Sequence, residues 1–264
     1  MRQIEAITND AIAALAPFGG QEGVELGIGA SHTIAVYLLP NLLPQLMHDW
    51  HKLRIHVMGG TTNEVLLALT THRIGIALIE APAHRPDLKI EVFGQDELAL
   101  IVRADHRWAR RPTVRAAELV HEPILLREVG SGMRQFVEEY LERNGVLRQQ
   151  LRTFIDINST EGIISAVEAG LGIGFVPRLA LERALKQGSL KAIQLENGPI
   201  RRELSIALLN GPDPKGPAGQ LLEILREQGA RKRYRMEKTQ TSDEPGKVIV
   251  MGNAPAEDKQ GAAS

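Results

Sequence analysis

The sequence lacks cysteine entirely, over all 264 residues. This absence excludes disulfide bonds, thiol nucleophiles and cysteine-ligated metal sites, and it is consistent with the reducing cytoplasm. Long apolar runs are also missing, since no uncharged stretch approaches the ~18 residues of a membrane-spanning helix. The start of the sequence has no apolar segment of the kind that a secretory signal peptide needs. We therefore expect a cytoplasmic protein that does not contact a membrane.

An excess of one charge is absent too, because 31 basic and 32 acidic residues leave a net charge of -1. Such a chain has no overall attraction for nucleic acids or anionic membranes, so nucleic-acid binding would require a local basic patch. The sequence does have 43% hydrophobic residues. That content is enough to bury a substantial core in one or two domains.

Strand-like and helix-like hydrophobic patterns alternate from residue 24 to residue 228. The expected strands are 24–28, 53–58, 74–79, 88–93, 97–102, 123–126, 153–157, 173–176 and 202–209, and the expected helices are 34–49, 64–71, 135–144, 162–169, 179–186 and 218–228. This order predicts an α/β protein with parallel, doubly wound sheets, in which the loops after the strands gather at one edge. Because Pro40 and Pro44 lack a backbone donor, we expect the helix over 34–49 to be kinked or split near Pro40.

The two ends of the chain depart from this pattern. Residues 3–15 predict an amphipathic connecting helix, which ends before Pro17. From 230 to 264 the composition becomes charged and rich in Gly, Pro, Ser and Ala, which predicts a disordered tail. The basic cluster at 231–235 is a candidate nucleic-acid contact, although a solvated tail is the commoner meaning of such a run.

Four loops place polar side chains between a strand and a helix: 31–33, 61–63, 127–134 and 158–160. Ser, Thr and Asn in such positions cap helices, and a glutamate three residues later completes a capping box. Thr61 with Glu64 and Asn158 with Glu161 have that spacing. The run Ser31-His-Thr has no such glutamate and offers more donors than one cap requires. We therefore favour a ligand-binding role for it, at a helix start where unpaired N–H groups attract anions.

The third loop carries arginines and glycines. Arg127 and Arg134 bracket Gly130 and Gly132. Glycine allows close approach of a ligand to the backbone, and arginine offers a rigid fork of donors to an anion. An exposed loop with two solvated arginines explains the same residues equally well.

Motifs for catalysis or for metal binding are mostly missing. His48, His51 and His56 are near one another in sequence, but without a convergent carboxylate they predict exposed side chains and no metal site. Residues 170–174 lie between a helix and a strand, which is the wrong order for a dinucleotide-binding loop; they predict a helix stop followed by a tightly packed strand. There is no P-loop and no nucleophile elbow. We expect neither an enzyme nor a bound cofactor or metal.

Taken together, these residues resemble a known family, the effector-binding (regulatory) domain of LysR-type transcriptional regulators. The runs that carry the resemblance are Gly29-Ala-Ser-His-Thr-Ile-Ala35 with Tyr37-Leu-Leu-Pro40, residues 59–64, Ile74-Gly-Ile-Ala-Leu-Ile-Glu-Ala-Pro82, Asp96-Glu-Leu-Ala-Leu-Ile-Val102 followed by His106, and Glu168-Ala-Gly-Leu-Gly-Ile-Gly-Phe-Val-Pro177. They extend over about residues 23–228. Each run is weak evidence alone, but together they are specific.

The resemblance implies a two-lobed, periplasmic-binding-protein-like (type 2) fold, in which each lobe is a doubly wound, mainly parallel sheet and two crossovers join the lobes. Lobe I would comprise 23–95 and 200–229, and lobe II would comprise 96–199. Residues 1–22 would be the remnant of a linker helix, and 230–264 the tail. The effector would lie in the cleft between the lobes. The family's cleft residues fall on Ser31, His32, Thr33, Thr61, Thr62, Arg127, Ser131, Met133, Asn158, Ser159, Phe175 and Pro177.

The resemblance also implies partners. These are a small-molecule effector and a second copy of the chain, in a homodimer or higher homo-oligomer. The run from Ala30 to Pro40 is most similar to a subgroup that senses small anions, although His32 departs from it. DNA would be bound only through a winged helix-turn-helix, which does not fit into the residues before Val24. The alternatives are a solute-binding protein of a transporter, a small enzyme on the same architecture, and a headless form that silences an intact regulator.

The hydroxyls at the start of the first long helix provide a test. We expect the double variant Ser31→Ala with Thr33→Ala to abolish a ligand-induced rise in melting temperature, because both hydroxyls face the ligand in this interpretation. The melting temperature of the unliganded protein should stay within a few degrees. Survival of the ligand-induced rise would mean that the stretch is only a helix cap.

Overall fold

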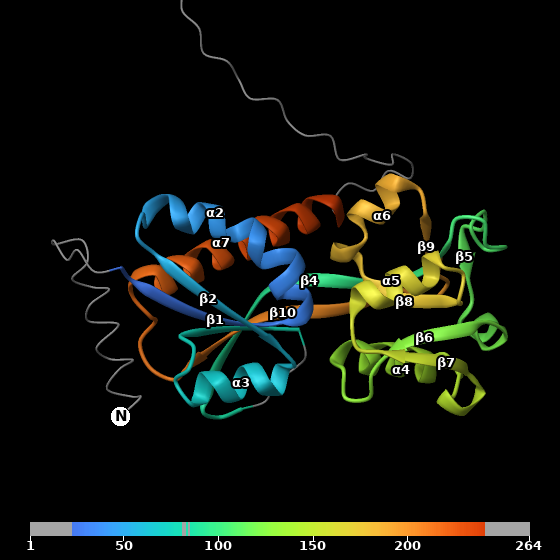
Figure 1. The fold of residues 1–264 in the computed structure, drawn as a ribbon, viewed down its shortest axis with the longest axis horizontal. Helices are drawn as coiled ribbons and strands as arrows, with labels where there is room; N and C mark the ends of the chain where they lie inside the picture. Colours follow the sequence, from blue (N-terminus) through green and yellow to red (C-terminus); the bar gives the residue numbers. More distant parts are fainter. Residues whose placement is uncertain (1–22, 81–82, 84, 241–264) are drawn as a thin grey trace, which may run out of the picture.

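A computed structural model describes residues 23–80, 83 and 85–240, which form one ten-stranded sheet with helices on both faces (Figure 1). The strands are β1 (Glu25–Ser31), β2 (Arg54–Gly60), β3 (Ile76–Ile79), β4 (Leu88–Arg103), β5 (Thr113–Val114), β6 (Pro123–Arg127), β7 (Arg152–Ile157), β8 (Ile173–Pro177), β9 (Leu190–Leu195) and β10 (Ile200–Leu209). The helices are the π-helix η2 (Ile34–Leu38), α2 (Leu39–Asp49), α3 (Thr62–Thr70), α4 (Gly132–Arg143), α5 (Thr160–Glu168), α6 (Glu182–Gln187) and α7 (Gly216–Gln240), with short 3-10 turns η3 (Ala116–His121), η4 (Arg148–Gln150) and η5 (Arg178–Ala180).

The strand order is β2-β1-β3-β10-β4-β8-β6-β7, with β9 beside β4 and β5 beside β9. In one half, β1 pairs in parallel with β2 and β3; in the other, β6 pairs in parallel with β7 and β8. The strands β10 and β4 are antiparallel to their neighbours and lie between the two parallel groups. The predicted α/β class is therefore confirmed, as a mixed sheet whose parallel strands carry the loops of interest.

The strands β4 and β10 connect the two halves. Residues Leu88 to Leu98 of β4 pair with β10, and from Leu98 to Arg103 the strand pairs with β8 and β9 of lobe II. We expected two strands here, 88–93 and 97–102, and that prediction was wrong. Pairing with β10 keeps the backbone extended through Gly94 and Gln95, with an irregularity in register at Leu204 and Ser205.

Three hydrophobic clusters form the core. One cluster contains only residues between 98 and 200 and fills lobe II. The other two lie in lobe I on opposite faces of the sheet, one under α2 and α7 and one under α3. Figure 1 shows the same arrangement, with α2 and α7 above the strands of lobe I and α3 below them. Packing on both faces explains why the parallel strands are almost continuously apolar.

The first long helix is split, as the prolines predicted. Residues 34–38 form the π-helix η2, and α2 begins at Leu39 with Pro40 in its first turn. Since Pro40 cannot donate a backbone hydrogen bond, the regular ladder cannot run through this point. The expected helix stop and packed strand at 170–174 are also confirmed. Gly170 has a φ of 80°, and a Cβ on Gly174 would come within 2.6 Å of Ile163 on α5.

The predictions for the two ends have different outcomes. The helix expected over 3–15 and the linker remnant at 1–22 lie outside the described residues. Helix α7 continues past residue 230, where we expected the tail to begin, as far as Gln240; residues 241–264 are outside the description. Among the described residues, no helix is both long enough and apolar enough to cross a membrane.

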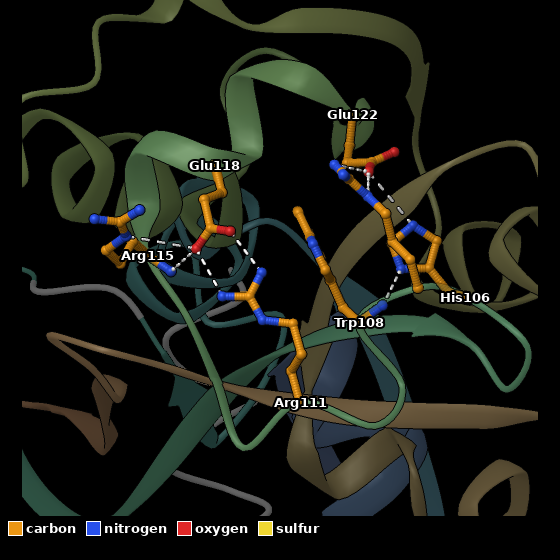
Figure 2. Close-up of polar contacts among 7 residues, drawn as sticks. His106, Trp108, Arg111, Arg115, Glu118 and Glu122 are labelled. Carbon is orange, nitrogen blue, oxygen red and sulfur yellow. Dashed lines mark hydrogen bonds and ion pairs between the residues drawn. The ribbon is translucent and has the colours of Figure 1, made fainter.

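The loop after β4 is fastened to lobe II by a buried tryptophan and several ion pairs (Figure 2). Trp108 is only 1% exposed and belongs to the lobe II core. Its backbone N–H donates to Nδ1 of His106 at 3.2 Å. Arg111 donates to both oxygens of Glu118, at 2.5 and 3.0 Å. These bonds, and one from the Arg115 backbone, lower the pKa of Glu118 to about 2.

Replacing the buried ring tests this account. We expect Trp108→Ala to lower the free energy of unfolding by about 3–5 kcal/mol, because it leaves a large cavity in a packed core. Leu147→Ala is the control, since Leu147 is 53% exposed and its truncation should cost no more than about 0.5 kcal/mol. Urea denaturation of both variants measures the difference. Equal losses would contradict the assignment of Trp108 to the core.

Candidate functional site

A cavity of about 200 Å³ lies where the ends of β1, β2 and β3 face the loop that enters α4. It is lined by Ser31, His32, Thr33, Gly60, Thr61, Thr62, Asn63, Glu80, Arg127, Glu128, Gly130, Ser131, Gly132, Met133, Gln135 and Phe136. The residues up to Glu80 belong to lobe I, and those from Arg127 onward belong to lobe II. The cavity is therefore built from both halves of the molecule.

Eight of the twelve predicted site residues line this cavity: Ser31, His32, Thr33, Thr61, Thr62, Arg127, Ser131 and Met133. The structure does not bring Asn158, Ser159, Phe175 and Pro177 to it. Asn158 is exposed, and the Ser159 hydroxyl accepts a hydrogen bond from the Gly162 N–H at 2.8 Å at the start of α5. Phe175 is 1% exposed within the lobe II core, and Pro177 pairs with Leu98 on β4.

The two predicted capping boxes have opposite outcomes. At α3, the Thr61 hydroxyl accepts from the Glu64 N–H at 3.3 Å, and the Glu64 carboxylate accepts from the Thr61 N–H at 2.8 Å. The bond from the Thr61 N–H, together with one from the Thr61 hydroxyl to the same carboxylate oxygen at 2.9 Å, lowers the pKa of Glu64. At α5 the prediction was wrong, because the capping residue is Ser159 and not Asn158. The glutamate expected to complete that box, Glu161, accepts a hydrogen bond from elsewhere.

Ser31 is the last residue of β1 and does not cap the following helix. Residues 32 and 33 are already helical, and the Thr33 side chain makes no capping hydrogen bond. Ser31 is 5% exposed, and within the described part of the chain its Oγ has no hydrogen-bond partner. A buried hydroxyl without a partner costs free energy, so such a group calls for an explanation beyond packing.

Beside Thr33 lies a buried ionic cluster centred on Arg202 of β10. The Arg202 side chain is fully buried and donates to Asp96 Oδ2 at 2.6 and 3.0 Å, to Glu80 Oε2 at 2.6 Å and to Thr33 Oγ1 at 3.3 Å. Asp96 is on β4, at the level where that strand passes between the lobes. One guanidinium thus joins the end of β3, the start of η2 and both connecting strands.

Sequence reasoning missed Glu80 and Arg202, although a signal was present. Arg202 alternates with Leu204 and Ile206 along β10, so it shares their inward face. Charges on the buried face of a strand are uncommon and need partners. Glu80 follows directly after an apolar strand. Pairing the two would have required knowing that β10 lies next to β3, which the pattern does not reveal.

The arginines of the third loop are buried, which excludes the solvated alternative. Arg127 is 5% exposed and donates to both oxygens of Glu128, at 2.7 and 2.9 Å. Burial alone would raise the pKa of Glu128, but the Arg127 guanidinium outweighs it, so the pKa is lowered. Arg134 is 3% exposed and donates to Glu138, to Asp156 and to the Arg127 carbonyl. Arg134 therefore holds the loop in shape, and Arg127 faces the cavity.

A further hydrogen bond joins the two lobes, between residues that do not line the cavity. The Tyr37 hydroxyl on η2 donates to Glu161 Oε1 on α5 at 2.6 Å. Burial, this bond and the negative charge of Glu161 all raise the pKa of Tyr37, so the hydroxyl keeps its proton. In Figure 1 the start of the first helix of lobe I lies beside α5.

The polar groups of the cavity are hydroxyls, helix starts and charged side chains. Within the described ranges there is no cluster of three or more His, Asp or Glu side chains that could hold a metal ion. His48, His51 and His56 are exposed. The cavity instead combines hydroxyls, an arginine and the first residues of α3 and α4, where backbone N–H groups favour negative charge.

Comparison with known proteins gives consistent matches. The family model for the LysR substrate binding domain matches residues 19–230. The HTH-type transcriptional regulator CysL of Bacillus subtilis is 33% identical over 181 residues, which are 69% of this chain and 60% of that protein. A probable RuBisCO transcriptional regulator of Phaeodactylum tricornutum is 30% identical over 207 residues, which are 77% of this chain and 67% of that protein. The chain thus spans about 60% of the length of CysL.

A solved structure shows the same fold. The regulatory domain of CcmR from Synechocystis PCC6803, in complex with 2-PG, has a TM-score of 0.70 at 22% identity, over 78% of this chain and 97% of that chain. This likeness confirms the predicted two-lobed, periplasmic-binding-protein-like fold.

The buried cluster provides a test of how the site is held. We expect Arg202→Met to cost about 3–5 kcal/mol of folding free energy, because it leaves two buried carboxylates without their cation. The adjacent Arg201 is exposed on the same strand, so Arg201→Met should change stability by no more than about 0.5 kcal/mol. Chemical denaturation compares them. A loss below about 1 kcal/mol for Arg202→Met would contradict the role of this cluster.

Proposed function

The chain belongs to the family of LysR substrate-binding domains, and from this premise we propose that it is the ligand-sensing regulatory domain of a LysR-type transcriptional regulator. The cavity between the lobes carries the proposal. It brings together polar loops from both halves and includes a buried, unpartnered hydroxyl at Ser31. A pocket with a few convergent polar groups is the usual form of a small-molecule site.

The effector that fits this site is a small acid. A volume of about 200 Å³ lies below the ~300 Å³ at which typical drug-sized pockets begin. Its acid group would lie near the starts of α3 and α4 and near Arg127, with Thr61, Thr62, Ser131 and Met133 around it. The CcmR regulatory domain, which has the same fold, binds 2-PG in its solved structure. The anionic character of the effector in this chain is part of the proposal.

Sensing would act through the relation between the lobes. A ligand that contacts both sides of the cavity favours the arrangement in which both sides are in reach. A change in the arrangement of the lobes would alter the Tyr37–Glu161 bond and the strands β4 and β10, which join the lobes. In the complete regulator, a homodimer or higher oligomer in the cytoplasm would carry this change to DNA-binding heads. The matched relatives are transcriptional regulators, which favours sensing over catalysis.

Each alternative function requires a property that can be tested. A transporter's solute-binding protein would need to be exported, and a small enzyme on this fold would need to turn over the ligand that stabilises it. A headless form that silences an intact regulator would co-purify with that regulator. The similarity to transcriptional regulators favours the first proposal over the solute-binding one.

A cavity-filling variant tests the proposed function. Native mass spectrometry of the freshly purified protein should reveal a retained small acid. At 100 times its Kd, that acid should stabilise the fold by about 2.7 kcal/mol, which corresponds to a rise in melting temperature of about 5–10 °C. We expect Thr62→Trp to remove both signals, because the indole occupies the cavity.

Thr71→Trp is the matched control, because Thr71 lies exposed at the other end of α3, away from the cavity lining. It should keep both the retained acid and the rise in melting temperature. Unchanged binding in Thr62→Trp would show that the ligand binds elsewhere and would contradict the proposal.

A further inference from the structure

Two buried oxygens in the cavity wall have no hydrogen-bond partner among the residues that the structure describes. They are Ser31 Oγ and Glu80 Oε1. Ser31 is only 5% exposed, and the Glu80 side chain is 12% exposed. Both residues line the cavity. A charged oxygen that is removed from water without a partner is costly, so a donor that reached it would be bound strongly.

Strand topology places these two residues at the same edge of the sheet. The strands β1 and β3 run in parallel, with Ala30 opposite Leu78. Ser31 ends β1, and Glu80 is the first residue after β3. The carboxyl ends of these neighbouring parallel strands thus bring a hydroxyl and a carboxylate to the same edge of the sheet, where both residues line the cavity.

The Glu80 carboxylate is also fixed in orientation. Its Oε2 accepts from Arg202 Nη1 at 2.6 Å, while Arg202 Nη2 donates to Thr33 and to Asp96. With one oxygen held by a fully buried guanidinium, the carboxylate cannot easily turn away. Its second oxygen remains a fixed acceptor in the cavity wall.

The charges on the cavity lining favour a ligand that has a hydrogen-bond donor in addition to an acid group. Of the described lining residues, Glu80 and Glu128 are acidic and Arg127 is the one arginine, already paired with Glu128. A simple anion would be attracted by the helix starts and repelled by the carboxylates. A ligand with an acid at one end and a donor at the other would satisfy both regions.

We propose that the effector carries a hydrogen-bond donor, a hydroxyl or an ammonium group, close to its acid group, and that Glu80 accepts from this donor beside Ser31. This inference rests on the proposed function and narrows it to hydroxy or amino acids. Simple inorganic anions and unsubstituted carboxylic acids are thereby excluded as effectors.

Matched acids separate this inference from the proposed function. The probes are propionate, lactate and alanine, then succinate, malate and aspartate, with sulfate as an inorganic anion. In each set the carbon skeleton is constant and only the donor changes. We expect a donor-bearing member of at least one set to bind at least about tenfold more tightly than its parent acid, by thermal shift and calorimetry.

Two variants locate the donor. Glu80→Gln removes the negative charge. It should therefore weaken the binding of an amino acid by more than tenfold and the binding of a hydroxy acid by less. This difference identifies which donor the effector carries. Ser31→Ala deletes an unpartnered hydroxyl, so this variant should be at least as stable as the unsubstituted protein. It should still lose part of the preference for donor-bearing acids over their parent acids. Glu203→Gln, at an exposed position on β10, is the control and should bind as the parent does.

The outcomes are distinct. A parent acid or sulfate that binds as tightly as the donor-bearing acids would overturn the inference and leave the proposed function standing. A preference that persists unchanged in both Glu80→Gln and Ser31→Ala would also overturn it. If no probe binds and native mass spectrometry detects no retained molecule, both the inference and the proposed function are contradicted.

Discussion

The buried guanidinium of Arg202 is the interaction on which the cavity depends. It bonds Asp96 on β4, Glu80 after β3 and Thr33 before η2, and it is itself on β10. A fully buried charge is tolerated only where its partners compensate for the lost water. Arg202 therefore fixes the ends of the lobe I strands relative to the two strands that enter lobe II. This also fixes the positions of Thr33 and Glu80 in the cavity wall.

This constraint separates side chains that maintain the site from those left for a ligand. The hydroxyls of Thr33 and Thr61 are already engaged, the first with Arg202 and the second in the capping box of α3. Arg134 is likewise engaged within its own loop. Ser31 and the second oxygen of Glu80 are not engaged by any described residue. The division matters because only groups without protein partners can gain a full hydrogen bond when a ligand arrives.

The sequence predicted the local parts of this site and missed the contacts between distant strands. The hydroxyl loops at Ser31 and Thr61 follow strands and precede helices, so their positions at a common sheet edge could be deduced from periodicity and turn chemistry. The single strand β4 could not, because its polar middle is kept extended by pairing with β10, more than 100 residues later in the chain. The Arg202 cluster escaped for the same reason. Asn158 was misplaced because Ser159, one residue further, fills the capping position.

The position of β10 has a consequence for how the chain is made. This strand lies between β3 and β4, so the sheet of lobe I remains open along both of those edges until about residue 209 has been synthesised. The core of lobe II, by contrast, draws only on residues between 98 and 200. During vectorial synthesis lobe II can complete its core first, while β3 and β4 wait with unpaired backbone groups. The ligand cavity is therefore among the last features of the molecule to exist, since Thr33 and Glu80 in its wall gain their shared partner only when Arg202 has been synthesised.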